Sequence, residues 1–152
     1  MDNPLLDQSG LPRFDEIEPA HVQPAIDALV VEAETALALA GRAQPVTWDN
    51  VIAPLEDATQ RLGRAWNQVG HLNAVVNTPV MREAFNAALP KVTGFFSALG
   101  QDQALFAAYQ ALSDQADALG LDALQRRVLA HALRDFRLGG AALADAERAR
   151  FS

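Results

Sequence analysis

The stretch TWDNVIAPLEDATQRLGRAWNQVGHLNAVV, residues 47–76, decides the fold class. Its apolar residues recur at spacings of three and four, at Trp48, Val51, Leu55, Ala58, Leu62, Ala65, Val69, Leu72 and Val76. This seam of about four heptads is typical of a long helix packed nearly parallel to a neighbour. Thr47 is the expected N-cap, and the helix dipole favours the negative charge of Asp49 in the first turn. The sequence therefore predicts one long helix here.

Three breaks in this pattern carry expectations of their own. Pro54 is expected to kink the first two turns, because proline has no main-chain N–H and clashes with the preceding turn. Gly63 and Gly70 lie seven residues apart and predict one spot where another helix approaches closely.

An irregular arm and a first helix are predicted before this stretch. Residues 1–18 hold Pro4, Gly10 and Pro12, which are turn-forming residues, and the arm is expected to be anchored by Leu11, Phe14 and Ile17. The helix is expected from Pro19 to Ala40, ending at Gly41. Pro24 leaves the first turn either bent or separate. The expected buried stripe is Val22, Ile26, Leu29, Val30, Ala33, Leu37 and Ala40.

Three more helices are predicted after it. One runs from Pro79, capped by Thr78, to Gly100 with a break or kink at Pro90, and buries Met81, Phe85, Ala88, Val92, Phe95 or Phe96, and Leu99. The next runs from near Asp102 to Gly120 and buries Leu105, Tyr109, Leu112 and Leu119. The last has a capping-box pattern at Asp122 and Gln125, and passes through Leu124, Val128, Ala132 and Phe136 to Gly139 and Gly140.

The predicted fold is therefore an all-α, antiparallel or irregular bundle of about five helices. A sixth amphipathic helix is expected to begin near Asp145 and to stop within two turns at Ser152. Such a short helix is marginal in water, so we interpret residues 1–152 as one N-terminal helical domain truncated in its sixth helix.

Composition excludes several classes of function. The formal net charge is −7, and the twelve Lys and Arg residues are scattered, so a nucleic-acid partner is not expected. There is no cysteine, which excludes disulfides, thiolate zinc sites and cysteine nucleophiles. The N-terminus lacks the pattern of a signal peptide, and no apolar run approaches the ~20 residues that span a bilayer. We expect a soluble, cytoplasmic protein with no membrane partner.

The residues that could carry chemistry are better explained as structural. None of His21, His71 and His131 belongs to a His-Glu-x-x-His pair. His131 and Asp135 have the i, i+4 spacing of a metal-chelating pair, but the same spacing occurs by chance, and an ordinary helix-surface contact is the preferred interpretation. His71 lies beside the seam and is interpreted as an interface residue. The carboxylates Asp15, Glu16 and Glu18 precede a helix, where the dipole favours them. No catalytic, cofactor-binding or metal-binding residue is predicted.

Five segments in order resemble a known family. They are FDEIEPAHVQPAI at 14–26, TWDN at 47–50, GHLNAVVNTP at 70–79, LP at 89–90 and ALRDFRLGG at 132–140. At these spacings they resemble the N-terminal region of the thimet oligopeptidase family of zinc metallopeptidases, over essentially the whole chain. No segment is diagnostic alone, but the ordered set is fairly specific.

The resemblance implies a function that belongs to a longer protein. Family members are several times longer and mainly helical, with two lobes that flank a channel admitting short peptides. Their His-Glu-x-x-His motif and third zinc ligand lie in the C-terminal half, at positions that this chain does not contain. The resemblance thus implies that residues 1–152 are a non-catalytic part of the channel wall, inactive and zinc-free alone, whose partners are the catalytic C-terminal portion and short peptide substrates.

Two rival readings come from other classes. The chain is alternatively a free-standing helical interaction module that holds a partner helix. Whether the fragment itself pairs with a second copy, through the face that truncation exposes, is left open by the sequence. A four-helix-bundle metal carrier ranks low, because Glu32, Glu34, Glu56 and Glu83 show no Glu-x-x-His pairing.

Overall fold

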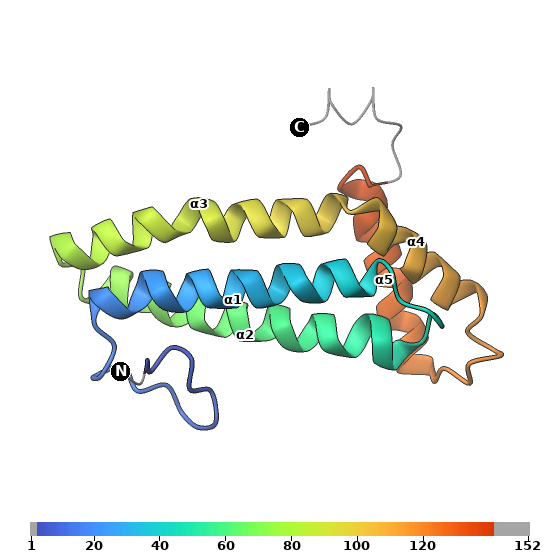
Figure 1. Cartoon of the computed structure of the whole chain (residues 1–152), viewed down its shortest axis with the longest axis horizontal. Helices are drawn as coiled ribbons and strands as arrows, with labels where there is room; N and C mark the ends of the chain where they lie inside the picture. Colours follow the sequence, from blue (N-terminus) through green and yellow to red (C-terminus); the bar gives the residue numbers. More distant parts are fainter. Residues whose placement is uncertain (1–2, 142–152) are drawn as a thin grey trace. The chain divides into compact units, whose positions relative to one another are not determined.

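The computed structural model describes residues 3–141, which form five α-helices and no β-strand (Figure 1). The helices are α1 (Pro19–Ala40), α2 (Trp48–Val75), α3 (Pro79–Gln101), α4 (Gln103–Asp114) and α5 (Ala123–Leu138). The predicted all-α class is confirmed, and the predicted bounds of the first three helices agree with the structure to within about one residue. The chain divides into two compact units.

The first unit contains the chain up to Thr35 together with Glu56–Phe95. In this unit α1 contacts both other helices, through an ion pair of 3.2 Å between Arg61 and Glu32 and another between Lys91 and Asp27. The parts of α2 and α3 in this unit form an antiparallel hairpin, because residues 76–78 join them directly and the Trp66 and Phe85 rings stack across them. The ring centroids are 4.6 Å apart.

The core of this unit consists mainly of the predicted stripes, with Phe85 of the α3 stripe only partly buried. The α2 seam is buried continuously from Val51 to Leu72, its first members lying in the second unit, whereas Val76 at its end is 54% exposed. Of the two candidates on α3, Phe95 is buried and Phe96 is 40% exposed. The fully enclosed apolar side chains of the first unit include Val22, Ala25, Ile26, Leu29, Ala33, Leu62, Ala65, Val69, Ala88 and Val92. Burial of this apolar surface is the main favourable contribution to folding.

Helix starts follow the caps expected from the sequence. The Met81 N–H donates to Thr78 Oγ1 at 3.2 Å, and the Asp122 carboxylate accepts from the Gln125 N–H at 2.8 Å in a complete capping box. At the start of α2 the hydrogen bond is reversed, because Asn50 Oδ1 accepts from the Thr47 N–H at 2.9 Å. These contacts satisfy main-chain groups that a helix end leaves unpaired.

The predicted proline breaks need one correction. Pro24, Pro54 and Pro90 all lie inside continuous helices, so the first turn of α1 is not a separate element. Each proline removes one main-chain N–H donor, but the helical hydrogen bonds of the neighbouring residues can still form, so the helix continues. The kinks remain predictions.

The second unit contains Ala36–Leu55 and the described chain from Phe96 to Ala141. Its core forms around α4 and α5, where the Phe136 ring is steeply inclined to the rings of Tyr109 and Phe106, at centroid distances of 5.4 and 5.9 Å. Other buried members are Ala40, Val51, Ile52, Leu55, Leu105, Ala108, Leu112, Ala116, Leu121, Leu129, Leu133 and Ala141.

Two predictions for this unit are wrong. Helix α4 ends at Asp114 and not at Gly120, because residues 115–120 turn so that Ala116 and Leu121 both enter the core. On α5 the prediction holds for Phe136, which is buried together with Leu129 and Leu133, and fails for Leu124 and Val128, which are 71% and 38% exposed. Neighbouring residues lie about 100° apart around a helix, so packing against α4 buries Leu129 and Leu133 and leaves Leu124 and Val128 exposed.

The expected close approach at Gly63 is also wrong. A Cβ atom built at Gly63 would meet no atom within 4 Å, and one at Gly70 would only touch the Phe85 ring at 4.0 Å. Gly63 instead faces open space. The sixth helix predicted from Asp145 lies outside the described residues, so the truncation and the single-domain organisation of 1–152 remain predictions.

Candidate functional site

The N-terminal arm, residues 3–18, is held to the first unit by two apolar anchors. Leu5 is completely buried and Ile17 is 7% exposed. The prediction for Leu11 was wrong, because this residue is 92% exposed, and Phe14 is 39% exposed. Leu11 lies between Gly10, whose carbonyl is bonded to Arg64, and Pro12, and its own side chain remains in solvent.

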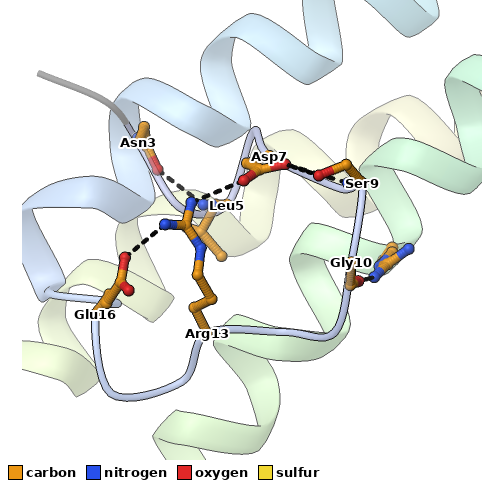
Figure 2. Close-up of polar contacts among 8 residues, drawn as sticks. Asn3, Leu5, Asp7, Ser9, Gly10, Arg13 and Glu16 are labelled. Carbon is orange, nitrogen blue, oxygen red and sulfur yellow. Dashed lines mark hydrogen bonds and ion pairs between the residues drawn. The ribbon is translucent and has the colours of Figure 1, made fainter.

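A chain of polar contacts shapes the arm between these anchors. Figure 2 shows Arg13 placed between two carboxylates, which it contacts at 2.9 Å (Asp7) and 2.8 Å (Glu16). Asp7 also accepts hydrogen bonds from the Ser9 hydroxyl at 2.7 Å and the Ser9 N–H at 3.2 Å. The hydrogen bond from the Ser9 side chain, followed by that from its N–H and the charges of Arg13 and Arg64, lowers the pKa of Asp7.

Three hydrogen bonds attach the arm to α2. The Arg64 guanidinium donates to the main-chain carbonyls of Gln8, at 3.1 Å, and Gly10. In return, the Gln8 side chain donates to the Arg61 carbonyl at 2.8 Å. Because hydrogen bonds from a charged group are stronger than neutral ones, Arg64 is the main polar attachment.

The attached arm and α2 line an open surface groove of about 630 Å³, which we call the arm groove. Pro12 and Phe14 form its arm side, and the Phe14 ring lies 5.1 Å from the His71 ring at the far end. The α2 side is lined by Gln60, Gly63, Arg64, Asn67, Gln68 and His71. Their spacings of three and four place them on one face of the helix.

Gln68 is the unusual residue of the arm groove. It is 5% exposed, and it is the one polar or charged residue among the buried residues of the described chain. Its Oε1 atom is buried and accepts no hydrogen bond from residues 3–141. Buried polar atoms in proteins are nearly always paired, so an unpaired one calls for an explanation such as a ligand or water. Sequence reasoning missed Gln68, although its position beside Val69 in the apolar seam was a signal.

The histidines predicted to be structural have local roles in the described chain. His21 Nδ1 accepts from the Glu18 N–H at 3.1 Å at the start of α1, and the His21 carbonyl accepts from Asn3. His71 packs against Phe14. Near His131, Asp135 is bound at 2.8 Å by Arg134.

Neither the carboxylates before α1 nor the histidines belong to a metal centre in the part of the chain that the structure describes. Glu16 is paired with Arg13. Across residues 3–141, no three His, Cys, Asp or Glu side chains gather in a way that would hold a metal ion. Within the same range, none of the helices combines the length and apolar composition that crossing a bilayer requires.

The sequence matches the family described as "Neurolysin/Thimet oligopeptidase, N-terminal domain" over residues 26–148. The chain belongs to this family. The resemblance predicted from the five sequence segments is thereby confirmed.

Curated relatives of this chain align with nearly all of it. The chain is 36% identical over 151 residues to Oligopeptidase A of Haemophilus influenzae and 36% identical over 152 residues to Oligopeptidase A of Escherichia coli. It is 32% identical over 150 residues to Probable cytosolic oligopeptidase A of Arabidopsis thaliana. Each alignment covers 99% of this chain but 22%, 22% and 21% of the respective relative. The chain therefore spans about a fifth of the length of these relatives.

Proposed function

We propose that this chain serves as the non-catalytic N-terminal helical part of a longer zinc metallo-oligopeptidase and forms part of the wall of its peptide channel. The observation that carries the proposal is the alignment of 99% of the chain with 22% of proteins named Oligopeptidase A. By this proposal the parent protein cleaves short peptides, and its catalytic portion is the main partner of the helices described above. Cytoplasmic location is part of the same proposal and is supported by the name of the cytosolic plant relative.

The zinc of such an enzyme would be held outside the described residues. Zinc sites in proteins need three or four His, Cys, Asp or Glu ligands, and residues 3–141 do not bring such a group together. By this proposal the residues described here supply no zinc ligand. Their contribution is to enclose the substrate and exclude bulky chains.

Cleavage of a fluorogenic short peptide tests whether catalysis requires the longer protein. The longer gene product is expected to cleave the peptide in a zinc-dependent manner, and residues 1–152 are expected to release no fluorophore with or without added zinc. Chelator-treated longer protein is the matched control. Metal-dependent turnover by purified residues 1–152 would contradict the proposal.

A second candidate, a helical interaction module, is based on the exposed apolar side chains of α5. Leu124 and Leu138 on α5 are 71% and 69% exposed, and Val128 on the same helix is 38% exposed. In a peptidase this apolar surface would be covered by the rest of the chain, whereas in a module it would hold a partner helix or a second copy.

Light scattering and the amide resonances of α5 together show whether a second copy or the rest of a longer protein covers this α5 surface. A dimer of residues 1–152 that Leu124→Ser dissociates favours self-association. A monomer whose α5 amide signals shift on addition of the remaining part of a longer gene product favours the peptidase.

A further inference from the structure

We propose that the exposed face shared by α1 and α3 in the first unit binds a basic, amphipathic helix from the remaining part of a longer protein. The inference rests on the proposed function, because only a longer protein contains such a helix in the same chain. The residues of this face differ from those of the arm groove and of the α5 surface.

Two shallow hollows lie between α1 and α3. The first has a volume of about 300 Å³, and Ala20 of α1 and Val80 of α3 are among the residues that line it. The second has a volume of about 390 Å³, and its lining includes Val31 of α1 and Gly94 of α3. Figure 1 shows that the two helices run in the same direction, so the hollows follow each other along both.

The hollows occupy one continuous face of each helix. Residues at helical spacings line them, on α3 at Val80, Ala84, Ala87, Lys91 and Gly94, and on α1 at Ala20, Asp27, Val31 and Glu34. Spacings of three, four and seven keep side chains on one face of a helix. We call this face the α1–α3 groove. From residue 80 to residue 94 a helix rises by roughly 21 Å, which is the length of another helix of about four turns.

The surface of the α1–α3 groove is apolar although it is exposed. Val31 and Val80 are each 61% exposed, and Ala20 and Ala87 are exposed as well. The water-facing side of a surface helix normally carries charged and polar residues. Among the exposed residues of α1, however, Glu34 is the one that carries a charge. Contiguous exposed apolar surface of this kind marks an interaction site.

The shape and chemistry of the groove favour a helix over an extended chain. A Cβ atom built at Gly94 would meet nothing within 4 Å, and Ala87 lies seven residues earlier, so a partner can approach α3 closely. An extended segment would place unpaired main-chain N–H and C=O groups against the apolar wall. A helix pairs these groups internally and presents only side chains.

The charges of the groove favour a basic partner. Lys91 forms an ion pair with Asp27, so its charge is already balanced. Glu83 lines one end of the groove and Glu34 the other, and neither carboxylate forms an ion pair with a residue of 3–141. A helix with Lys or Arg near each end therefore gains two ion pairs. A second copy of this chain is disfavoured, because its formal net charge of −7 is repelled by the same carboxylates.

A longer protein has the chain length to supply this helix. The alignment covers 22% of Oligopeptidase A of Escherichia coli, so most of such a protein lies outside the 152 residues. A helix in the same chain is present at a high effective concentration, and a groove of modest affinity is then filled.

Thiol labelling tests the groove, because the 152-residue sequence contains no cysteine. Val31→Cys places a thiol in the groove, and Asn86→Cys, at an exposed position of α3 outside both hollows, is the matched control. Both variants are made in residues 1–152 and in the longer gene product, and mass spectrometry follows their alkylation by iodoacetamide. We expect labelling at position 31 to be at least about tenfold slower in the longer protein, and labelling at position 86 to be equal in both.

Reversal of the two free carboxylates tests the charge of the partner helix. In the longer Val31→Cys protein, Glu34→Lys combined with Glu83→Lys replaces two attractions by two repulsions. It is expected to raise the labelling rate at position 31 about tenfold, because the groove is uncovered more often. Glu56→Lys combined with Asp57→Lys, at exposed positions of α2 outside the groove, is the control and is expected to leave the rate unchanged.

Cleavage of the fluorogenic peptide separates this inference from the proposed function. If the longer protein cleaves the peptide but position 31 is labelled equally fast in both proteins, the inference about the groove fails alone. If the gene encodes no longer protein, both fail. Labelling of position 31 that slows in residues 1–152 as their concentration rises would show that a second copy covers the groove, and the proposed occupant would be wrong. A labelling rate that the reversal of Glu34 and Glu83 leaves unchanged or lowers would also overturn the proposal.

Discussion

The guanidinium of Arg64 donates a hydrogen bond of 3.1 Å to the main-chain carbonyl of Gln8, 56 residues earlier in the sequence. A second bond from the same group reaches the carbonyl of Gly10. We expect Arg64→Met to lower the free energy of unfolding by about 1–2 kcal/mol, since each charge-assisted bond contributes about 1.5–3 kcal/mol when well shielded and these are partly exposed. Urea unfolding measures the loss, and limited proteolysis of the arm shows where it occurs. Arg127→Met, at an exposed position of α5, is the control; equal losses in both variants would refute the attachment.

The attachment of the arm is also expected to depend on pH through Asp7. The Ser9 hydroxyl, then its N–H and the nearby Arg13 and Arg64, lower the pKa of Asp7 below its ordinary value of 3.8. A lowered pKa means that the folded arm favours the ionised form. The stabilisation is therefore fully present above pH 3.8 and is lost as the pH falls through the lower folded value.

A carboxyl titration followed by ¹³C resonance measures this shift and its cause. Ser9→Ala is expected to return the pKa of Asp7 toward 3.8, because its hydroxyl is the largest contributor. Lys91→Met is the matched control: its side chain is the main cause of the lowered pKa of Asp27, so it is expected to raise that pKa alone. If Ser9→Ala leaves the pKa of Asp7 unchanged, the hydrogen bonds described for the arm are contradicted.

Two glycines are expected to respond oppositely to alanine. Gly63→Ala is expected to raise the free energy of unfolding by about 0.5–1 kcal/mol, because the position is inside α2 and its Cβ meets nothing within 4 Å. Gly41→Ala is expected to destabilise, because its Cβ would lie 3.0 Å from the Cβ of Ala104. Chemical unfolding of both variants decides the matter; the same sign at both positions would show that these local environments are wrong.

The buried face of α5 can be checked with a pair of leucines five residues apart. Leu129 is 1% exposed, so Leu129→Ala is expected to cost about 2–5 kcal/mol in the free energy of unfolding. Leu124 is 71% exposed, and Leu124→Ala is expected to change it by less than about 0.5 kcal/mol. Denaturant midpoints of the two variants give the comparison. Comparable losses of unfolding free energy in the two variants would instead support burial of Leu124 and Val128, as the sequence pattern predicted.

Local physics made the helices predictable from the sequence. A cap such as Asp122 with Gln125 acts over three residues, and both of its hydrogen bonds are present. The seam from Val51 to Leu72 has one apolar face only, so its burial follows from the spacing alone. The absence of a catalytic motif in residues 1–152 and the family resemblance were equally visible in the order of residues.

Where the apolar spacing allowed more than one set of buried residues, the tertiary structure decided which set is buried. Helix α5 carries two apolar stripes, and only packing against α4 selected Leu129 over Leu124. The arm offers several apolar residues, and the shape of the first unit buried Leu5 while leaving Leu11 in solvent. The arm groove depends on Arg64 meeting Gln8, a contact between residues 56 positions apart that no short-range rule contains. Sequence by itself thus determined where helices form, because their hydrogen bonds are local, whereas the arm groove and its buried Gln68 exist only once distant segments pack together.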